Sequence, residues 1–283
     1  MRKIIFTLFC ILISLTAYGN SCNVTCPSET MKVIEDENVF LKVTGINFLT
    51  KKIVETAIEK ELKDELNSKF NADLDIFTLK RLKSGEFKNL LLISDNFRYR
   101  AMSISDFKAE TICPYNQIIY KNKKVYYPND LPFKFNANIT NNDIKNIIKS
   151  KEFQKQIQRS AVKINGFTTL EVQEPIVTIK NGQLEFSIPI RTFLSNEPFI
   201  MNLNSNIEVA NNKIMLKDTT FSTNSNIINI DILGGIINQV NPVAFQINSI
   251  DSKYCKIYIT SAKIEGNIIK TEGIFIINKN YER

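Results

Sequence analysis

An uninterrupted helical pattern in residues 46–70 limits the folds open to this chain more than any other stretch. Neither proline nor glycine interrupts it, and charged residues occupy one face. Apolar residues recur at spacings of three and four, which places them in one stripe on a helix; they are Ile46, Leu49, Ile53, Val54, Ala57, Ile58, Leu62, Leu66 and Phe70. Most helices in small domains are shorter. This stripe needs a second apolar surface to cover it.

Strand patterns dominate the rest of the chain and supply such a surface. Apolar and polar residues alternate most clearly through residues 183–209, the pattern of half-buried strands. Asn181-Gly182 predicts a two-residue hairpin turn just before them. In residues 225–240 the apolar period becomes helical, and Asn241-Pro242 ends that segment. These patterns predict an α+β fold, in which a long curved antiparallel β-sheet wraps around the long N-terminal amphipathic helix, with a second apolar helix near the C-terminus.

The N-terminus has the pattern of an export signal. Arg2 and Lys3 precede an apolar run over residues 4–17, and Ala17-Tyr18-Gly19 resembles a cleavage site. We therefore expect a signal peptide over residues 1–19, an extended lead-in over 20–45 and one domain over 46–283. The expected location is the periplasm or the cell envelope. A retained membrane anchor, or a lipid on Cys22, is the alternative.

Four cysteines remain once Cys10 is removed with the signal peptide. An even number in an oxidising compartment predicts disulfides. Cys113 and Cys255 both lie in strand-like surroundings, so we expect them to pair, which leaves Cys22 and Cys26 to close a small loop. Zinc bound by four thiolates is the alternative, although the spacing is not that of a zinc ribbon.

Residues for catalysis are scarce. The chain has no histidine, which excludes Ser-His-Asp and Cys-His catalysis and histidine-ligated zinc. It also has no G-x-S-x-G motif and no glycine-rich phosphate loop. The carboxylate pairs Asp73/Asp75 and Glu171/Glu174 occupy positions expected to face solvent on strands. We therefore expect neither enzymatic activity, nor a bound metal, nor a cofactor.

The formal net charge of +7 falls to +5 once the signal peptide is removed with Arg2 and Lys3. Basic residues cluster at 80–88 and again at 121–124. Such clusters either keep a surface solvated or attract anionic lipid head groups. A transient contact with a membrane surface is therefore expected. Nucleic acid is not an expected partner, because basic and aromatic residues are not interleaved, and the sequence identifies no protein partner.

Several segments in order resemble the LmeA-like phospholipid-binding family of exported bacterial proteins. The resemblance covers most of residues 46–278. It rests on the segments ELKDELNSKFNADLDI, LKSGEFKNLLLIS, FRYRAMSISDFKAETIC, NNDIKNIIKS, NGQLEFSIPI and IDILGGIINQVNPV. It implies a fold akin to the tubular lipid-binding domains, in which a curved sheet and a long helix enclose acyl chains. The family supplies no catalytic residues to transfer.

The expected function is therefore phospholipid binding or lipid transfer in the cell envelope, with acyl chains held in an apolar cavity between helix and sheet. The expected lining is aliphatic and aromatic, from both helices and from the strands after residue 183: Leu49, Ile53, Ile58, Phe186, Ile188, Phe199, Met201, Leu203, Ile232 and Ile236. Two alternatives remain. One is a non-catalytic structural or adhesive β-domain with a filled core, and the other is an envelope enzyme acting on lipids, which lacks a catalytic set.

Overall fold

The structure is a computed structural model of the 283-residue chain. It describes residues 24, 26–27, 46–99, 102–121, 124–159, 162–164, 167–192, 197–223, 237, 240–244 and 255–279. The expected signal peptide lies outside the described residues. So does the expected second apolar helix, including Ile232 and Ile236, apart from residues 237 and 240.

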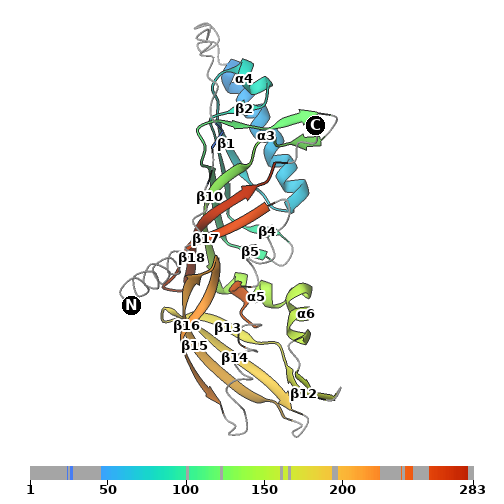
Figure 1. Ribbon diagram of the computed structural model, residues 1–283, viewed down its shortest axis with the longest axis vertical. Helices are drawn as coiled ribbons and strands as arrows, with labels where there is room; N and C mark the ends of the chain where they lie inside the picture. The colour runs from blue at the N-terminus through green and yellow to red at the C-terminus, as the bar shows by residue number, and fades with distance from the viewer. Residues whose placement is uncertain are drawn as a thin grey trace, which may run out of the picture.

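A six-stranded antiparallel sheet forms the upper half of the molecule in Figure 1, in the order β1-β3-β6-β10-β18-β17. Its strands are β1 (Asn71–Asp75), β3 (Asn89–Ser94), β6 (Asp106–Thr111), β10 (Leu131–Thr140), β17 (Cys255–Glu265) and β18 (Ile268–Ile277). Three two-stranded sheets extend this half: β2 (Glu86–Phe87) with β7 (Asn116–Gln117), β4 (Phe97–Tyr99) with β5 (Met102–Ile104), and β8 (Ile119–Lys121) with β9 (Lys124–Tyr126).

A second six-stranded sheet forms the lower half, in the order β11-β12-β14-β15-β16, with β13 also paired to β14. Its strands are β11 (Val162–Ile164), β12 (Phe167–Val172), β13 (Ile176–Lys180), β14 (Gln183–Thr192), β15 (Phe199–Ala210) and β16 (Lys213–Thr223). Pro175 separates β12 from β13, which share β14 as a partner. Strand β17 of the upper sheet contacts β15, so the two halves are joined.

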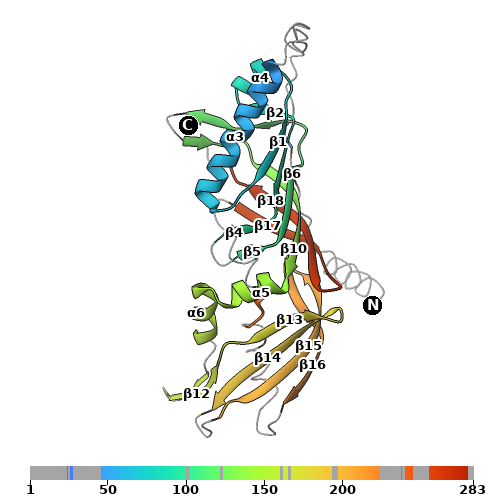
Figure 2. The ribbon, with the colours of Figure 1, turned by 180° about the vertical axis from the view of Figure 1, so that it is seen from behind.

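Helix α3 (Ile46–Leu66) lies beside β1, at the edge of the upper sheet (Figures 1 and 2). The carboxylates of Glu55 and Glu59, one helical turn apart, accept the backbone N–H groups of Leu74 and Ala72, each at 3.0 Å. An edge strand presents unpaired N–H groups that need such partners. The helix therefore completes the hydrogen bonding of the sheet edge.

The fold class predicted from the sequence, a single sheet wrapped around this helix, is wrong. The chain is mostly β and forms two six-stranded sheets, and α3 covers one strand edge. Its apolar stripe divides between two surroundings. Ile58 and its neighbours at helical spacing pack against the core, whereas Leu49 is 62% exposed and Ile53 69% exposed. Hydrogen bonding to the strand edge fixes the orientation of the helix, and this orientation leaves Leu49 and Ile53 in solvent.

Two short helices join the halves. The capping residues at 140–143 and the apolar spacing after them predict one helix over 143–148 and another over 151–157, and both are present. They are α5 (Asn141–Ile148) and α6 (Lys151–Arg159). Helix α5 begins with a capping box, in which the Thr140 hydroxyl accepts from the Asp143 N–H and the Asp143 carboxylate accepts from the Thr140 N–H. The same carboxylate, 2% exposed, accepts hydrogen bonds from the hydroxyls of Ser103 at 2.8 Å and Ser105 at 2.6 Å. It therefore anchors α5 to the upper sheet.

Aromatic side chains fill the interior of the upper half. The rings of Phe133 and Phe275 are stacked, with centroids 4.7 Å apart, and those of Phe97 and Phe107 lie 5.0 Å apart. Gly273 of β18 faces this cluster, and a β-carbon there would lie 2.7 Å from the Phe135 ring. The glycine therefore gives the ring room to lie against the strand.

Local predictions were borne out unevenly. Asn181 and Gly182 have φ of 53° and 76°, as the predicted hairpin turn requires. The apolar residues Leu74, Ile76 and Leu79 predict a strand over residues 74–82. This prediction is wrong, because Thr78 caps a short helix, α4 (Leu79–Lys83), inside that segment. Alternation through residues 97–112 predicts one long strand. This prediction is also wrong, because the segment is divided into β4, β5 and β6.

The predicted disulfide pairs are wrong as well. Cys26 is bonded to Cys113, with their Cα atoms 5.4 Å apart. This bond excludes both the Cys113–Cys255 pair and the Cys22–Cys26 pair. It ties the N-terminal segment to the end of β6 and closes a far larger loop than Cys22–Cys26 would. A disulfide is typical of a protein that folds in an oxidising compartment.

Candidate functional site

Five of the predicted lipid-lining residues lie together on one face of two neighbouring strands in the lower half. Strands β14 and β15 place them in register, with Phe186 opposite Leu203 and Ile188 opposite Met201. These four side chains are 0–2% exposed. Phe199, opposite Ile190, is half-buried at the end of the same row. Alternation along both strands thus produces one continuous apolar face, which we call the β14–β15 face.

Short helices contribute side chains to the same core. Ile144 and Ile147 of α5 and Phe153 and Ile157 of α6 are buried in the cluster that contains the β14–β15 face. Helix α5 contacts β13, and α6 contacts β12. The Asn141 side chain fastens α5 to β13 by accepting from the Ile179 N–H at 2.5 Å and donating to the Ile179 carbonyl at 3.2 Å.

The lining residues predicted on the first helix do not join this face. Leu49, Ile53 and Ile58 belong to α3 in the upper half, whereas β14 and β15 lie in the lower half (Figure 1). Leu49 and Ile53 are exposed to solvent. Ile58 is partly buried and packs against the core where α3 lies beside β1. The structure therefore places the helix and strand members of the predicted lining at two separate places.

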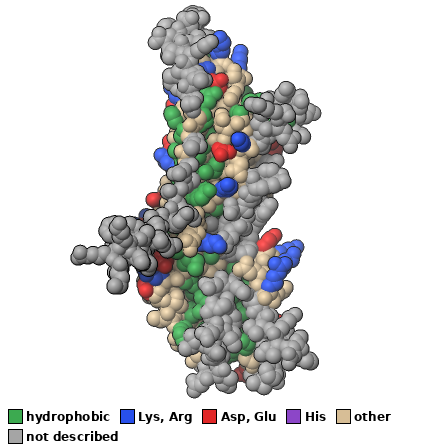
Figure 3. All heavy atoms as spheres, in the orientation of Figure 1, with side chains coloured by type: hydrophobic (Ala, Val, Ile, Leu, Met, Phe, Trp, Pro, Cys, Tyr) green, Lys and Arg blue, Asp and Glu red, His purple; other side chains and the backbone are tan. Residues whose placement is uncertain are grey.

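Basic residues of α4 lie at the upper end of the molecule. Figure 1 places α4 there, and Figure 3 shows lysine and arginine side chains at this end as well as farther along the same face. The Arg81 guanidinium lies 3.9 Å from the centroid of the Phe77 ring and donates to the Glu86 carboxylate at 2.7 Å. Lys80 and Lys83 are exposed on α4. The basic cluster seen in the sequence at 80–88 is thus one surface.

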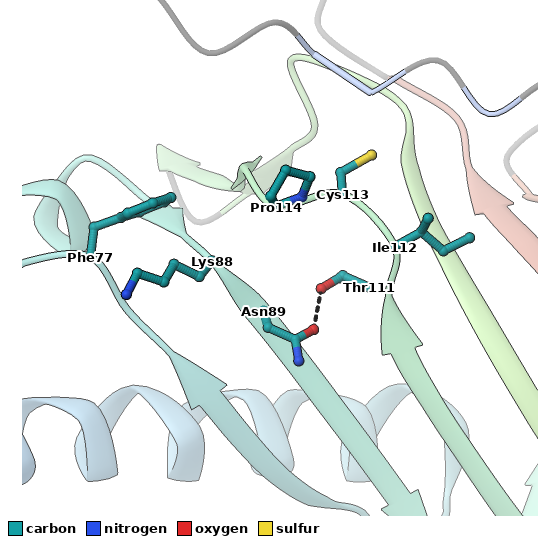
Figure 4. A pocket seen from close by; sticks show the side chains of 7 residues that line it. All are labelled: Phe77, Lys88, Asn89, Thr111, Ile112, Cys113 and Pro114. Carbon is teal, nitrogen blue, oxygen red and sulfur yellow. Dashed lines mark hydrogen bonds between the residues drawn. The ribbon is translucent and has the colours of Figure 1, made fainter. Parts of the chain in front are cut away.

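A pocket of ≈ 370 Å³ opens beside this basic surface (Figure 4). Aromatic, aliphatic and polar side chains line it: Phe77, Lys88, Asn89, Thr111, Ile112, Cys113 and Pro114. The Thr111 hydroxyl donates to the Asn89 side-chain oxygen at 2.7 Å and accepts from the Leu90 N–H at 3.0 Å. Sequence reasoning did not find this pocket, because its walls come from strands 20 residues or more apart.

Buried Asn116 holds the two walls of the pocket together. Its side-chain amide donates to the Lys88 carbonyl at 2.8 Å and to the Cys113 carbonyl at 2.7 Å. The pairing of β2 with β7 brings Phe87 opposite Asn116. The Cys26–Cys113 disulfide lies on the wall that Cys113 forms. The pocket is therefore built on fixed backbone.

Ion pairs perturb three titratable groups in the upper half, and one of them is Glu265, whose carboxyl pKa is lowered by a hydrogen bond from Lys270 at 2.6 Å. A hydrogen bond from Lys134, 3.1 Å away, and a second from Asn89 lower the pKa of the Glu110 carboxyl. The hydrogen bond to Asp73, at 2.8 Å, raises the pKa of Lys51. The Glu110 and Glu265 pairs join neighbouring strands and the Lys51 pair joins α3 to β1, and none of them forms an acid–base pair.

Catalytic geometry is not found in the described ranges. The carboxylates of Asp73, Asp75, Glu171 and Glu174 are exposed, as predicted. Among the described residues, no three cysteine, aspartate or glutamate side chains are grouped to hold a metal ion. Nor is any helix in the described part both long and apolar enough to cross a bilayer.

Comparisons with known proteins give no family for this chain. No family model matches it, and neither does any curated protein or solved structure.

Proposed function

We propose that this chain is an exported lipid-binding protein of the bacterial cell envelope, similar in function to the LmeA-like family, and that it holds acyl chains against the β14–β15 face. The observation that carries the proposal is the composition of this face. Phe186, Ile188, Met201 and Leu203 form adjacent rows without a charged side chain. Helix α3 has no part in holding the acyl chains.

Carrying a lipid needs an apolar surface and no reaction. Each methylene buried is worth about 0.8 kcal/mol, so two chains of about 16 carbons are worth roughly 25 kcal/mol. A diacyl lipid therefore hardly leaves a bilayer unless a protein offers comparable apolar surface. Loading places the acyl chains between the β14–β15 face and the side chains of α5 and α6 that now pack in the same core.

A membrane contact through the upper end fits the charges there. Leu49 and Ile53 lie one helical turn apart on the outer side of α3, with Lys52 beside them. Exposed aliphatic residues next to lysines favour the interface of an anionic bilayer. We infer a transient, peripheral contact with anionic lipid.

A structural envelope domain with a filled core is the second candidate. One observation favours it: the β14–β15 face is already covered, since four of its side chains are at most 2% exposed. Ordinary core has this burial too. The two candidates differ in whether lipid enters the core.

Uptake of a fluorescent phospholipid by the purified, delipidated chain tests the proposal. We expect Ile188→Asp to abolish uptake, because an unpaired carboxylate would then lie within the apolar face. Ile176→Asp is the matched control: Ile176 is 65% exposed on the neighbouring strand β13, so this variant keeps uptake.

Circular dichroism reports whether each variant is folded. Where Ile188→Asp does not fold, Ile188→Phe replaces it, since an added ring takes volume from the lipid while keeping the face apolar. Undiminished uptake by a folded Ile188→Asp chain, or by Ile188→Phe, contradicts the proposed lining and favours the structural domain.

A further inference from the structure

We propose that the pocket between Phe77 and Pro114 binds the phosphate group of a small phosphate ester, either free or as the head group of a lipid. This site lies in the upper half, far from the β14–β15 face in Figure 1, and it goes beyond the proposed function. Its ligand does not depend on lipid entering the lower core.

Positive charge beside the pocket is not balanced. Residues 75–89 contain four basic residues and two acidic ones. Of the acidic residues, Glu86 forms an ion pair with Arg81 at 2.7 Å. Asp75 on β1 lies opposite Asn89 on the neighbouring strand β3. Within the described part of the chain, the ammonium groups of Lys80, Lys83 and Lys88 have no ion-pair partner.

Lys88 is the cation placed to meet a ligand in the pocket. It lines the wall, and its Nζ lies 5.6 Å from the centroid of the Phe77 ring. The Arg81 guanidinium lies 3.9 Å from the centroid of the same ring. The Arg81 charge is already paired with Glu86, so within the described part of the chain Lys88 is the cation near this ring that has no ion-pair partner.

A further carboxylate on the strand pair that lines the pocket, that of Glu110, is already engaged. Glu110 is bonded to Lys134 at 3.1 Å and to the Asn89 amide at 2.8 Å. The ring of Phe77 and the side chain of Pro114 then provide apolar walls for the organic part of an ester (Figure 4). A pocket of ≈ 370 Å³ has the size of a small-ligand site.

The pocket is also preorganised for a ligand. The Asn116 amide bridges the backbone of Lys88 and of Cys113, so the lysine wall and the disulfide wall keep a fixed separation. Binding then orders little besides the Lys88 side chain, which lowers its entropic cost.

Calorimetric titration of the full, oxidised chain with glycerol 3-phosphate tests the site. Because hydrogen bonds to charged groups are the strong ones, we expect Lys88→Ala to weaken binding about tenfold. Lys83→Ala removes the same charge on α4 outside the pocket, and we expect it to change the affinity less than about twofold. Equal losses in the two variants, or no saturable binding by the unmodified chain, would overturn the proposal.

Vesicles distinguish the two sources of phosphate. If the ligand is a head group, Lys88→Ala lowers co-sedimentation with phosphatidylglycerol vesicles more than Lys83→Ala does. If the ligand is a free ester, the two variants bind vesicles equally and differ only with glycerol 3-phosphate. Uptake of fluorescent lipid, measured in the same variants, is unchanged in either case. If the pocket binds no phosphate ester, the proposal that the β14–β15 face holds acyl chains is unaffected, because the uptake assay tests it separately.

Discussion

The capping of β1 by Glu55 and Glu59 predicts an uneven response to loss of the two carboxylates. Glu55 is 4% exposed and accepts the Leu74 N–H, so Glu55→Ala leaves a buried amide without a partner. An unsatisfied buried donor costs about 1–3 kcal/mol. Glu59 is half-buried, so Glu59→Ala is expected to cost about 0.5–1.5 kcal/mol. Alanine favours helix more than glutamate does, so any loss of unfolding free energy comes from the lost hydrogen bonds to the edge strand β1.

Urea unfolding followed by circular dichroism measures both losses. Glu61→Ala is the matched control, because Glu61 is exposed on the same helix and should change stability by less than about 0.5 kcal/mol. Glu55→Gln keeps an acceptor oxygen and should retain most of the stability. Amide hydrogen exchange adds a local reading, since the Leu74 amide should exchange faster in Glu55→Ala alone. If Glu55→Ala and Glu61→Ala are equally stable, the capping role of α3 is refuted.

Three further outcomes follow from other contacts. Cys113→Ala should cost about 2–4 kcal/mol of unfolding free energy, seen as a lower urea midpoint, because the disulfide closes a loop between residues 87 positions apart; an unchanged midpoint would show that the disulfide does not constrain the unfolded chain. Gly273→Ala should lose about 1–3 kcal/mol by overpacking against the backbone carbonyl of Tyr258 and the Phe135 ring, and an unchanged melting temperature would contradict these close approaches. The lowered pKa of Glu110 means that its ion pair stabilises the fold above the ordinary value of 4.5 and that this contribution is lost as the pH falls. Lys134→Met should therefore lose less stability than the unmodified chain on acidification below this value, and equal losses would rule the pair out as a source of acid sensitivity.

Local structure was predictable where one residue type decides the backbone. Asn181 and Gly182 take positive φ, which few other pairs adopt, and the alternation in β14 and β15 placed the correct residues on the buried face. The N-cap of α5 was also predictable, because T-N-N-D before an apolar run offers capping side chains. Each signal is contained within about ten residues.

Tertiary partners were not predictable from the same patterns. An apolar stripe tells which side of a helix prefers burial, but not how much of it will be covered, and Leu49 and Ile53 stay exposed because Glu55 and Glu59 fix the helix at a strand edge. Four cysteines allow three pairings, and spacing alone does not choose among them. The pocket depends on the antiparallel pairing of β3 with β6, which no local pattern encodes.

The ends of several strands were not predicted, for a related reason. Alternation continues from Phe97 to Ile112, although the chain turns twice within that stretch. The Thr78 cap of α4 was hidden in the same way, inside a segment whose leucines also fit a strand. The alternation of apolar and polar residues, taken alone, therefore overestimates the length of strands in this chain.

Mass spectrometry of the chain's own bound lipid tests the central claim most directly. The protein is expressed with an export signal, purified without detergent and extracted with organic solvent. The account predicts about one phospholipid per chain, lost from a folded Ile188→Asp variant and kept in Ile176→Asp. A folded chain that yields no lipid, and that takes up no fluorescent phospholipid, would contradict lipid binding and leave the β14–β15 face as the filled core of a structural domain.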